Sequence, residues 1–298
     1  MISKISVEQN LFAMTTIVVT EHREKNVLVS SQASGFFFAK TTPLSLSSDK
    51  QDGHWEKLDR FWLITNRHVV LHKVDNVECL AEKFTFNLRK SIGDKIDWHP
   101  ITLTRTELQS VLLLHSNENV DVAVIDVTSC IEKILNTAGE LRKQIAIPAT
   151  LSQKNLPDKQ PIDIEVTSDI IVASYPKGFY DTFNKFPIIK SGIIASAWGL
   201  HFNGEPMFQI DAQLFPGSSG GLVISKPMNL TIKNGEILYS KVGKQYVLLG
   251  VYSGEYCWKE SVEFERGKFL EQKRSYGLGN VWYSYLIVEI INNGVKFI

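Results

Sequence analysis

The sequence feature that most restricts the fold is a glycine-rich turn that runs directly into a short apolar strand. Residues 217–221 read Gly-Ser-Ser-Gly-Gly, and residues 222–224 read Leu-Val-Ile. Glycine has no Cβ and adopts positive φ easily, so this backbone can turn sharply and present its N–H groups outward. Ser219 would then be an exposed nucleophile, with Gly217 N–H and Ser219 N–H placed to bind an oxyanion beside it. A glycine-rich hairpin without any chemistry accounts for the same residues, because clusters of glycine and serine are common in loops.

The positions of the histidines exclude one class of serine hydrolase. The spacing of Gly217, Ser219 and Gly221 also fits the nucleophile elbow of α/β-hydrolases, in which the histidine base follows the serine. The histidines of this chain are His22, His54, His68, His72, His99, His115 and His201. None follows Ser219, so the α/β-hydrolase order is impossible and any base must come from upstream.

His68 is the candidate base because it lies just beyond the end of an apolar segment, residues 61–65, that predicts a strand. A scaffold strand can fix the ring at the edge of a cleft, and imidazole accepts and returns protons near neutral pH. Two other interpretations stay open. His68 can be a structural histidine, or it can pair with His72, four residues on, as a metal ligand. The metalloprotease form of such a pair needs glutamate after the first histidine, and Val69 stands there.

Asp121 is the candidate carboxylate that orients the base. It opens an otherwise apolar strand predicted at residues 120–127, so a buried charge there would need a partner such as a histidine N–H. A turn residue at the entrance of a strand is the plainer interpretation of Asp121 alone. The chain order His68, Asp121, Ser219 supports all three assignments together, since a serine nucleophile needs a base and the base needs an orienting group.

Three segments resemble the catalytic motifs of trypsin-like serine proteases, and most of all those of the HtrA/DegP-like branch. They are residues 65–70 (Thr-Asn-Arg-His-Val-Val), 121–124 (Asp-Val-Ala-Val) and 211–221 (Asp-Ala-Gln-Leu-Phe-Pro-Gly-Ser-Ser-Gly-Gly). Residues 174–179 and 191–196 are similar to the strand pair that precedes the serine in that branch, and residues 249–254 resemble the strand that pairs with substrate. The resemblance spans roughly residues 10–293.

The many short strand-like segments predict an all-β fold of barrels or sandwiches, with one helix near residues 285–291. The resemblance implies the chymotrypsin-like arrangement of two packed antiparallel β-barrels with a C-terminal helix. Residues 1–140 would carry His68 and Asp121, and residues 141–298 would carry Ser219 and the oxyanion hole. We expect a linker at residues 128–160. Insertions or loops are expected at residues 41–59, 226–245 and 256–275.

The resemblance also implies a serine endopeptidase that works through an acyl-enzyme. The oxyanion donors would be the N–H groups of Gly217, Ser218 and Ser219. The expected substrate-binding residues are Gln213, Leu214, Phe215, Ser253 and Gly254. Gln213 falls where trypsins place an acidic residue, so we expect an uncharged side chain before the scissile bond. Ser218 replaces the aspartate that pairs with a freed amino terminus in digestive trypsins, so zymogen activation of that kind is not expected.

The composition of the chain argues against nucleic acid and membranes as binding partners. The formal net charge is +0, which gives no electrostatic attraction to nucleic acid, and no apolar run approaches the roughly 18 residues of a membrane helix. Cys79, Cys130 and Cys257 are few and far apart, as in reduced proteins, and the first ten residues lack the apolar core of a signal peptide, so we expect a cytoplasmic protein. We expect a polypeptide substrate and neither a metal nor another cofactor.

Two questions of function stay open at the level of sequence. An activating partner and a homo-oligomer are both compatible with the chain, and no residues are left over for the PDZ module of the HtrA/DegP-like branch. A protease-fold binding or scaffold protein with little or latent activity is the alternative to an active endopeptidase. We favour the enzyme because all the residues of the expected triad are present.

Overall fold

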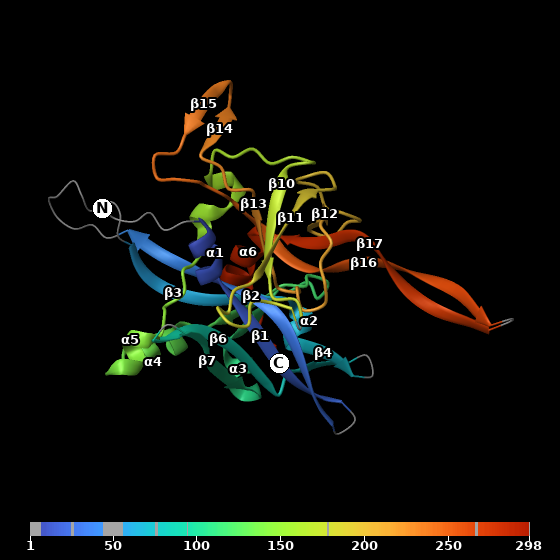
Figure 1. Cartoon of the computed structure of the whole chain (residues 1–298), viewed down its shortest axis with the longest axis horizontal. Helices are drawn as coiled ribbons and strands as arrows, with labels where there is room; N and C mark the ends of the chain where they lie inside the picture. The colour runs from blue at the N-terminus through green and yellow to red at the C-terminus, as the bar shows by residue number, and fades with distance from the viewer. Residues whose placement is uncertain are drawn as a thin grey trace.

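Antiparallel strand pairing organises most of the chain (Figure 1). The computed structural model describes residues 7–24, 27–43, 56–74, 77–93, 95–177, 179–265 and 268–297. In these residues the strands form a seven-stranded sheet, a closed barrel of six strands and two small hairpins. The predicted all-β class is therefore confirmed, and the arrangement is consistent with the expected double barrel and its C-terminal helix.

The seven-stranded sheet is built from the first half of the chain, in the order β7-β6-β1-β2-β3-β9-β8. Its strands are β1 (Thr15–Glu24), β2 (Val27–Pro43), β3 (Glu56–Thr65), β6 (Lys83–Ile92), β7 (Lys95–Thr104), β8 (Leu112–Leu114) and β9 (Ala123–Asp126). Phe84, Phe86 and Leu88 alternate along β6 and are buried in the core of the sheet, because every second side chain of a strand points to the same face. A small hairpin of β4 (Leu71–Val74) and β5 (Val77–Leu80) lies beside it.

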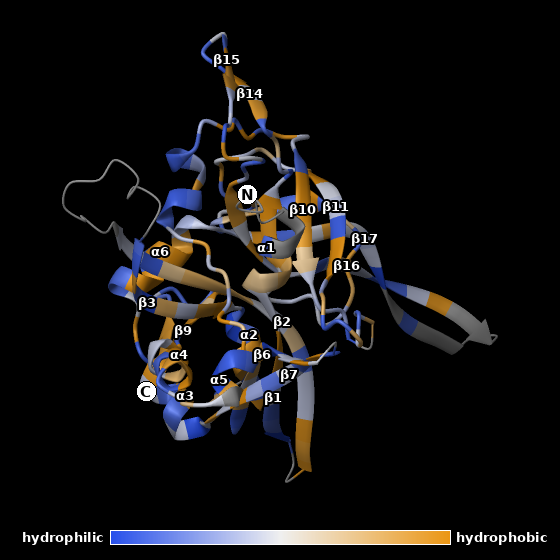
Figure 2. Cartoon of the chain, turned by 60° about the vertical axis from the view of Figure 1, so that its left-hand side comes forward, coloured by the Kyte–Doolittle hydropathy of each residue, from blue (hydrophilic) through white to orange (hydrophobic). Residues whose placement is uncertain are grey.

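The closed barrel is built from the second half, in the order β10-β11-β12-β17-β16-β13. Its strands are β10 (Asp169–Ser174), β11 (Ile188–Ile194), β12 (Met207–Asp211), β13 (Leu222–Ser225), β16 (Leu248–Glu265) and β17 (Lys268–Tyr283). Hydrophobic residues dominate β10 (Figure 2), which pairs with β11 on one side and β13 on the other. A second hairpin, β14 (Leu230–Lys233) with β15 (Glu236–Tyr239), forms the middle half of the insertion predicted at residues 226–245.

One strand of the first sheet contributes to two hydrophobic cores. Phe36, Phe37 and Phe38 follow one another on β2, and all three are buried. Phe37 packs within the seven-stranded sheet, whereas Phe36 and Phe38 pack in a cluster that includes Leu222 and Leu248 of the barrel. Alternation along β2 therefore joins the two β-units, because the two faces of the strand serve different cores.

The predicted C-terminal helix is confirmed as α6 (Tyr285–Asn293). Leu286, Ile287 and Ile290 give it an apolar face, and all three are buried in the cluster shared by the two β-units. The helix ends at Gly294, whose N–H donates to Ile290 O at 2.8 Å. No helix in the described parts of the chain combines the length and the apolar character needed to cross a membrane.

The shorter helices correct two local predictions. They are α1 (Val7–Met14), α2 (Arg67–Val70), α3 (Arg105–Val111), α4 (Thr128–Leu135), α5 (Glu140–Gln144) and the 3₁₀ turns η2 (Gln153–Asn155) and η3 (Pro157–Lys159). The apolar run from Leu11 to Thr20 predicts a strand, but residues 11–14 belong to α1 and the strand β1 begins at Thr15. The linker expected at residues 128–160 contains α4, because Ile131 and Ile134 share a helical face that is buried in the first core.

Residues 256–275 are also different from the expected loop. Residues 256–265 and 268–275 form the outer parts of β16 and β17, in which Trp258, Glu260 and Val262 share one face of the strand. In the insertion predicted at residues 41–59, β2 extends to Pro43 and β3 begins at Glu56, and residues 44–55 lie outside the described residues. The domain boundary between residues 140 and 141 coincides with the start of α5 and stays a prediction.

Candidate active site

His68 lies where β3 ends and the single turn of α2 begins. Asn66 precedes this turn in an extended conformation (φ −90°, ψ 155°), and its side chain is fully buried. The Asn66 Nδ2 group donates to the backbone oxygen of Asp121 at 2.7 Å. The turn is therefore fixed to the segment that carries Asp121, although Asn66 and Asp121 lie 55 residues apart in the chain.

Asp121 holds His68 through both of its carboxylate oxygens. The His68 backbone N–H donates to Asp121 Oδ1 at 2.8 Å, and the ring atom Nδ1 lies 2.6 Å from Asp121 Oδ2. An ionised carboxylate only accepts hydrogen bonds, so the ring proton belongs on Nδ1 and Nε2 of His68 is left as an acceptor. Asp121 lies two residues before β9, whereas the sequence predicts it at the start of the strand itself.

The environment of His68 raises the pKa of its imidazole above the usual value of 6.5. Desolvation by the surrounding protein is the largest single influence and would lower this pKa. The negative charge of Asp121 and the hydrogen bond to it act in the opposite direction and outweigh it. Half of the His68 side-chain surface is exposed, so solvent and a substrate can reach the imidazole ring.

Ser253 connects Asp121 with Ser219. Its hydroxyl donates to Asp121 Oδ2 at 2.6 Å, and its backbone oxygen accepts from Ser219 Oγ at 3.0 Å. The register of β16 against β17 shifts between Tyr252 and Gly254, so Ser253 is the extra residue of a β-bulge. Bulges turn a side chain out of the regular strand alternation. Sequence reasoning expected Ser253 to contact substrate and missed this link, because nothing local marks a bulge at this serine.

The three residues of the expected triad therefore lie in one connected network of hydrogen bonds. The order of contacts is His68, Asp121, Ser253, Ser219. Among the described residues no hydrogen bond joins the His68 ring to Ser219 directly, since the Ser219 hydroxyl is turned toward Ser253. Rotation about one side-chain bond changes this direction without moving the backbone, and hydroxyl rotors of this kind reorient readily.

The glycine-rich turn has the backbone conformation that its sequence indicates. Gly217 and Gly220 have φ of 93° and 80°, in the left-handed region that favours glycine. A Cβ on Gly217 would lie only 2.5 Å from the backbone nitrogen of Lys177, and one on Gly220 would collide with Ser34 O and the Thr65 hydroxyl. Neither position can therefore hold a larger residue in this conformation.

Two of the three predicted oxyanion donors are free within the turn. In the described structure the N–H groups of Gly217 and Ser219 have no protein acceptor, whereas Ser218 N–H donates to Phe215 O at 3.0 Å. The backbone oxygen of Pro216 points away, because it accepts from Lys177 N at 2.8 Å. The turn therefore presents Gly217 N–H and Ser219 N–H beside the Ser219 hydroxyl.

Ser34 of β2 supports this turn from the other β-unit. Its N–H donates to Ser219 O and its hydroxyl donates to Gly217 O, both at 2.8 Å. The hydroxyl also accepts from Tyr175 N at 2.8 Å, and the Ser34 backbone oxygen accepts from the Thr65 hydroxyl at 2.8 Å. Ser34 is buried, and sequence reasoning did not identify it, since its partners lie up to 185 positions away in the chain.

Some of the expected substrate-binding residues are exposed, whereas the side chain of another is buried. Leu214 is buried in the barrel core, and its N–H donates to Glu255 Oε1 at 3.2 Å. Gln213 is exposed, and Phe215 has 51% of its surface exposed, with Lys190 Nζ 5.0 Å from its ring centre. Gln213 and Phe215 are therefore open to a ligand, whereas the Leu214 side chain is not.

The metal interpretation of His68 and His72 has no support in the described residues. His72 lies on β4 with its ring 4.1 Å from that of His22, and His68 is bonded to Asp121. Among the residues that the structure describes, no group of three or more histidine, cysteine, aspartate or glutamate side chains could hold a metal ion.

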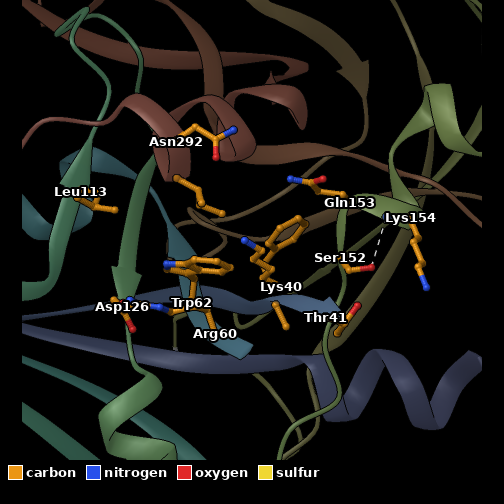
Figure 3. Close-up of a pocket in the computed structure, with 13 residues that line it drawn as sticks. Lys40, Thr41, Arg60, Trp62, Leu113, Asp126, Ser152, Gln153, Lys154 and Asn292 are labelled. Atoms are coloured by element: carbon orange, nitrogen blue, oxygen red, sulfur yellow. Dashed lines mark hydrogen bonds and ion pairs between the residues drawn. The ribbon is translucent and has the colours of Figure 1, made fainter. Parts of the chain in front are cut away.

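A cavity of about 520 Å³ lies apart from this network (Figure 3). Its wall combines Trp62 with the charged residues Lys40 and Arg60, and Arg60 Nη1 contacts Asp126 Oδ2 at 2.7 Å. None of the expected site residues lines it. The candidate active site, which takes residues from both β-units, is therefore separate from this cavity.

Residues 33–230 match the model of a trypsin-like peptidase domain, and this range contains His68, Asp121 and Ser219. The chain is also similar to a solved structure described as a thermostable serine protease, AL20, from an extremophilic microorganism. The sequence identity is 11%, the match covers 95% of this chain and 99% of that chain, and the TM-score is 0.42. The comparison with curated proteins found no match.

Proposed function

Because the chain belongs to the family of trypsin-like peptidase domains, we propose that it is a serine endopeptidase in which His68, Asp121 and Ser219 act as a triad. The observation that carries this proposal is the hydrogen-bond network in which Asp121 holds the His68 ring and is linked through Ser253 to the Ser219 hydroxyl. The role of each group follows from its place in that network.

In the first step Ser219 Oγ attacks the carbonyl carbon of a peptide bond, and His68 Nε2 takes the hydroxyl proton. For this step the Ser219 hydroxyl leaves Ser253 O and turns to the ring. Asp121 keeps the proton on Nδ1 and stabilises the imidazolium that forms. The raised pKa of His68 fits this role, since the same contacts that raise it favour the protonated ring.

The carbonyl oxygen becomes negatively charged in the tetrahedral intermediate, and the N–H groups of Gly217 and Ser219 bind it. When the carbon–nitrogen bond breaks, His68 gives its proton to the leaving amine, and the acyl group stays on Ser219. Water then attacks the ester, His68 takes a proton from it, and the second product leaves with the Ser219 hydroxyl restored.

A protease-fold protein with little or latent activity is the second candidate function. The direction of the Ser219 hydroxyl favours it, because that hydroxyl bonds to Ser253 O and has no bond to the described His68 ring. The free N–H groups of Gly217 and Ser219 favour an active enzyme, because a latent site of this design has no need of them.

A fluorophosphonate probe separates the two candidates. We expect the probe to label the wild-type protein at Ser219, because an activated serine beside two free N–H donors reacts with phosphorus electrophiles as it does with a carbonyl. Peptide mass spectrometry locates the label, and Ser219→Ala should remain unlabelled. A folded wild-type protein that takes up no label would contradict the enzyme and favour the latent protein.

For specificity we propose substrates with an uncharged residue before the scissile bond. Gln213 is exposed and carries no charge, and Phe215 adds an exposed apolar ring. Digestion of a peptide library should therefore show little cleavage after lysine or arginine, as read by mass spectrometry of the products. Dominant cleavage after either basic residue would reject the proposal and would turn attention to Glu255, whose carboxylate contacts Leu214 N.

We also propose that the protein is nearer to the HtrA/DegP-like branch than to digestive trypsins. The segments at residues 174–179 and 191–196 carry this resemblance, and β10 pairs with β11 in the same region. Ser218, which stands where digestive trypsins have aspartate, is buried and accepts a hydrogen bond from Ser174 Oγ at 3.1 Å. This neutral contact supports the expectation that a freed amino terminus is not needed.

A further inference from the structure

The longest hairpin of the protein extends beyond the barrel. β16 and β17 pair from Gly250 opposite Tyr283 to Glu265 opposite Lys268. The other barrel strands stop pairing with them at Val251 and at Leu278. We call the outer part, residues 256–265 and 268–276, the arm; Figure 1 shows it projecting from the molecule.

One edge of β16 is open from the candidate active site onward. Tyr252 makes the last backbone bonds to the glycine-rich turn, donating to Gly221 O at 3.0 Å and accepting from Gly220 N at 2.8 Å. Beyond it, Ser253 O receives only the Ser219 hydroxyl, and no described backbone group pairs with the outer residues along this edge. A free strand edge offers N–H and C=O groups to an added strand.

The arm carries aromatic side chains that the protein does not cover. Tyr256, Trp258 and Tyr276 are 45%, 36% and 57% exposed. Their rings pack together, with centroid distances of 4.4 Å between Trp258 and Tyr276 and 6.2 Å between Tyr256 and Tyr276. A two-stranded ribbon has no second layer to bury such a cluster, and exposed aromatic clusters mark places where another chain binds.

We propose that the arm is an extended substrate-binding surface for unfolded polypeptides. A substrate chain whose scissile bond lies at Ser219 adds as a strand along the open edge of β16. Its aromatic or large aliphatic side chains then pack on the aromatic cluster of Tyr256, Trp258 and Tyr276. This inference rests on the proposed function, because it takes Ser219 as the point where the substrate is cut.

The open edge of β16 begins at the candidate active site, and this favours a bound substrate on the arm over a second copy of the chain. The open edge begins at Ser253, which is bonded to Ser219, and the aromatic cluster begins three residues further along the same strand. A regular strand rises about 3.3 Å per residue, so Trp258, five residues beyond Ser253, lies at most about 16 Å along the edge, because the register shifts between Tyr252 and Gly254 and between Glu255 and Cys257 shorten this path. A substrate reaches it only with about five extended residues on that side, which a folded protein rarely offers.

The test compares substrate lengths. A fluorogenic peptide with one cleavage site is made in a short form and in forms extended by four and by eight residues on either side, with an aromatic residue in the outer half. We expect the eight-residue extension on one side to raise kcat/KM on the order of tenfold, mainly through KM, because aromatic packing contributes about this much. The double variant Trp258→Ala/Tyr276→Ala should lose this gain.

Three controls isolate the contribution of the aromatic rings. Trp258→Phe/Tyr276→Phe should keep most of the gain, because the rings remain. Lys259→Ala should keep all of it, since strand alternation places Lys259 on the other face from Trp258, where it bonds to Glu271. Fluorophosphonate labelling and cleavage of the short peptide should be unchanged in every arm variant, so a failed triad is distinguished from a failed arm.

Two results would overturn the arm proposal. One is the same length dependence in the wild type and in Trp258→Ala/Tyr276→Ala, with short-peptide cleavage intact. The other is sedimentation showing that this double variant converts a dimer to a monomer while the gain from longer peptides persists, which would assign the aromatic cluster to a second copy of the chain.

Discussion

Replacing Ser219 with alanine is expected to lower kcat for a susceptible peptide on the order of 10⁶-fold. The change removes the attacking oxygen and leaves the N–H groups of Gly217 and Ser219 in place, so the variant should still bind substrate with little change in KM. The residual rate should come only from the oxyanion donors and from substrate positioning. Steady-state kinetics with active-site titration by the fluorophosphonate probe measures the loss.

Ser191→Ala is the matched control for this variant. Ser191 is an exposed serine on β11 and has no contact with the network around Ser219. Its replacement should leave kcat unchanged. Retention of more than a hundredth of the wild-type kcat by Ser219→Ala, in a preparation free of other proteases, would show that another group is the nucleophile.

Replacing Asp121 with asparagine is expected to lower kcat by about 10⁴-fold while the fold is retained. The carboxylate accepts from His68 N, from the His68 ring and from the Ser253 hydroxyl. An amide can accept on only one of its two atoms. Its NH₂ group beside the ring would favour the tautomer with the proton on Nε2, and that nitrogen could not then take the proton of Ser219.

The dependence of kcat/KM on pH gives this variant a second readout. The pKa of His68 lies above 6.5 in the wild type, and protonated His68 cannot act as a base. Activity should therefore fall as the pH drops through a midpoint above 6.5. Without the charge of Asp121, desolvation is left as the main influence and lowers the pKa, so the acid limb of Asp121→Asn should move to lower pH. An acid limb at the same pH in both proteins would mean that His68 is not the base.

Chain order and local motifs were sufficient to predict which residues of the candidate site lie close together in the structure. The order His68, Asp121, Ser219 and the glycines at 217 and 220 led to residues that lie in one network with the expected backbone conformation. Ser34 and Ser253 could not be found in this way. Each acts through hydrogen bonds to residues more than 30 positions away, and one of them depends on a β-bulge that only strand register shows.

The fold class could be predicted because the spacing of apolar residues within a short segment shows which face of a strand or helix is buried. The arm was expected to be a loop because its charged residues obscured the alternation of Trp258 and Val262. Helix α1 was missed because its apolar residues run on into β1 without a break. In both places the partner strand or the packing surface decides the conformation, and neither is visible in a short window of sequence.

The support that Ser34 gives to the glycine-rich turn makes the position of Ser219, the proposed nucleophile, dependent on the other half of the molecule. Two of the backbone oxygens that shape the turn, those of Gly217 and Ser219, are held by this single residue of β2. Ser34 precedes Ser219 by 185 residues, so the turn takes this shape only after both parts of the chain have been made. The shape of the glycine-rich turn therefore depends on the docking of the two β-units against each other.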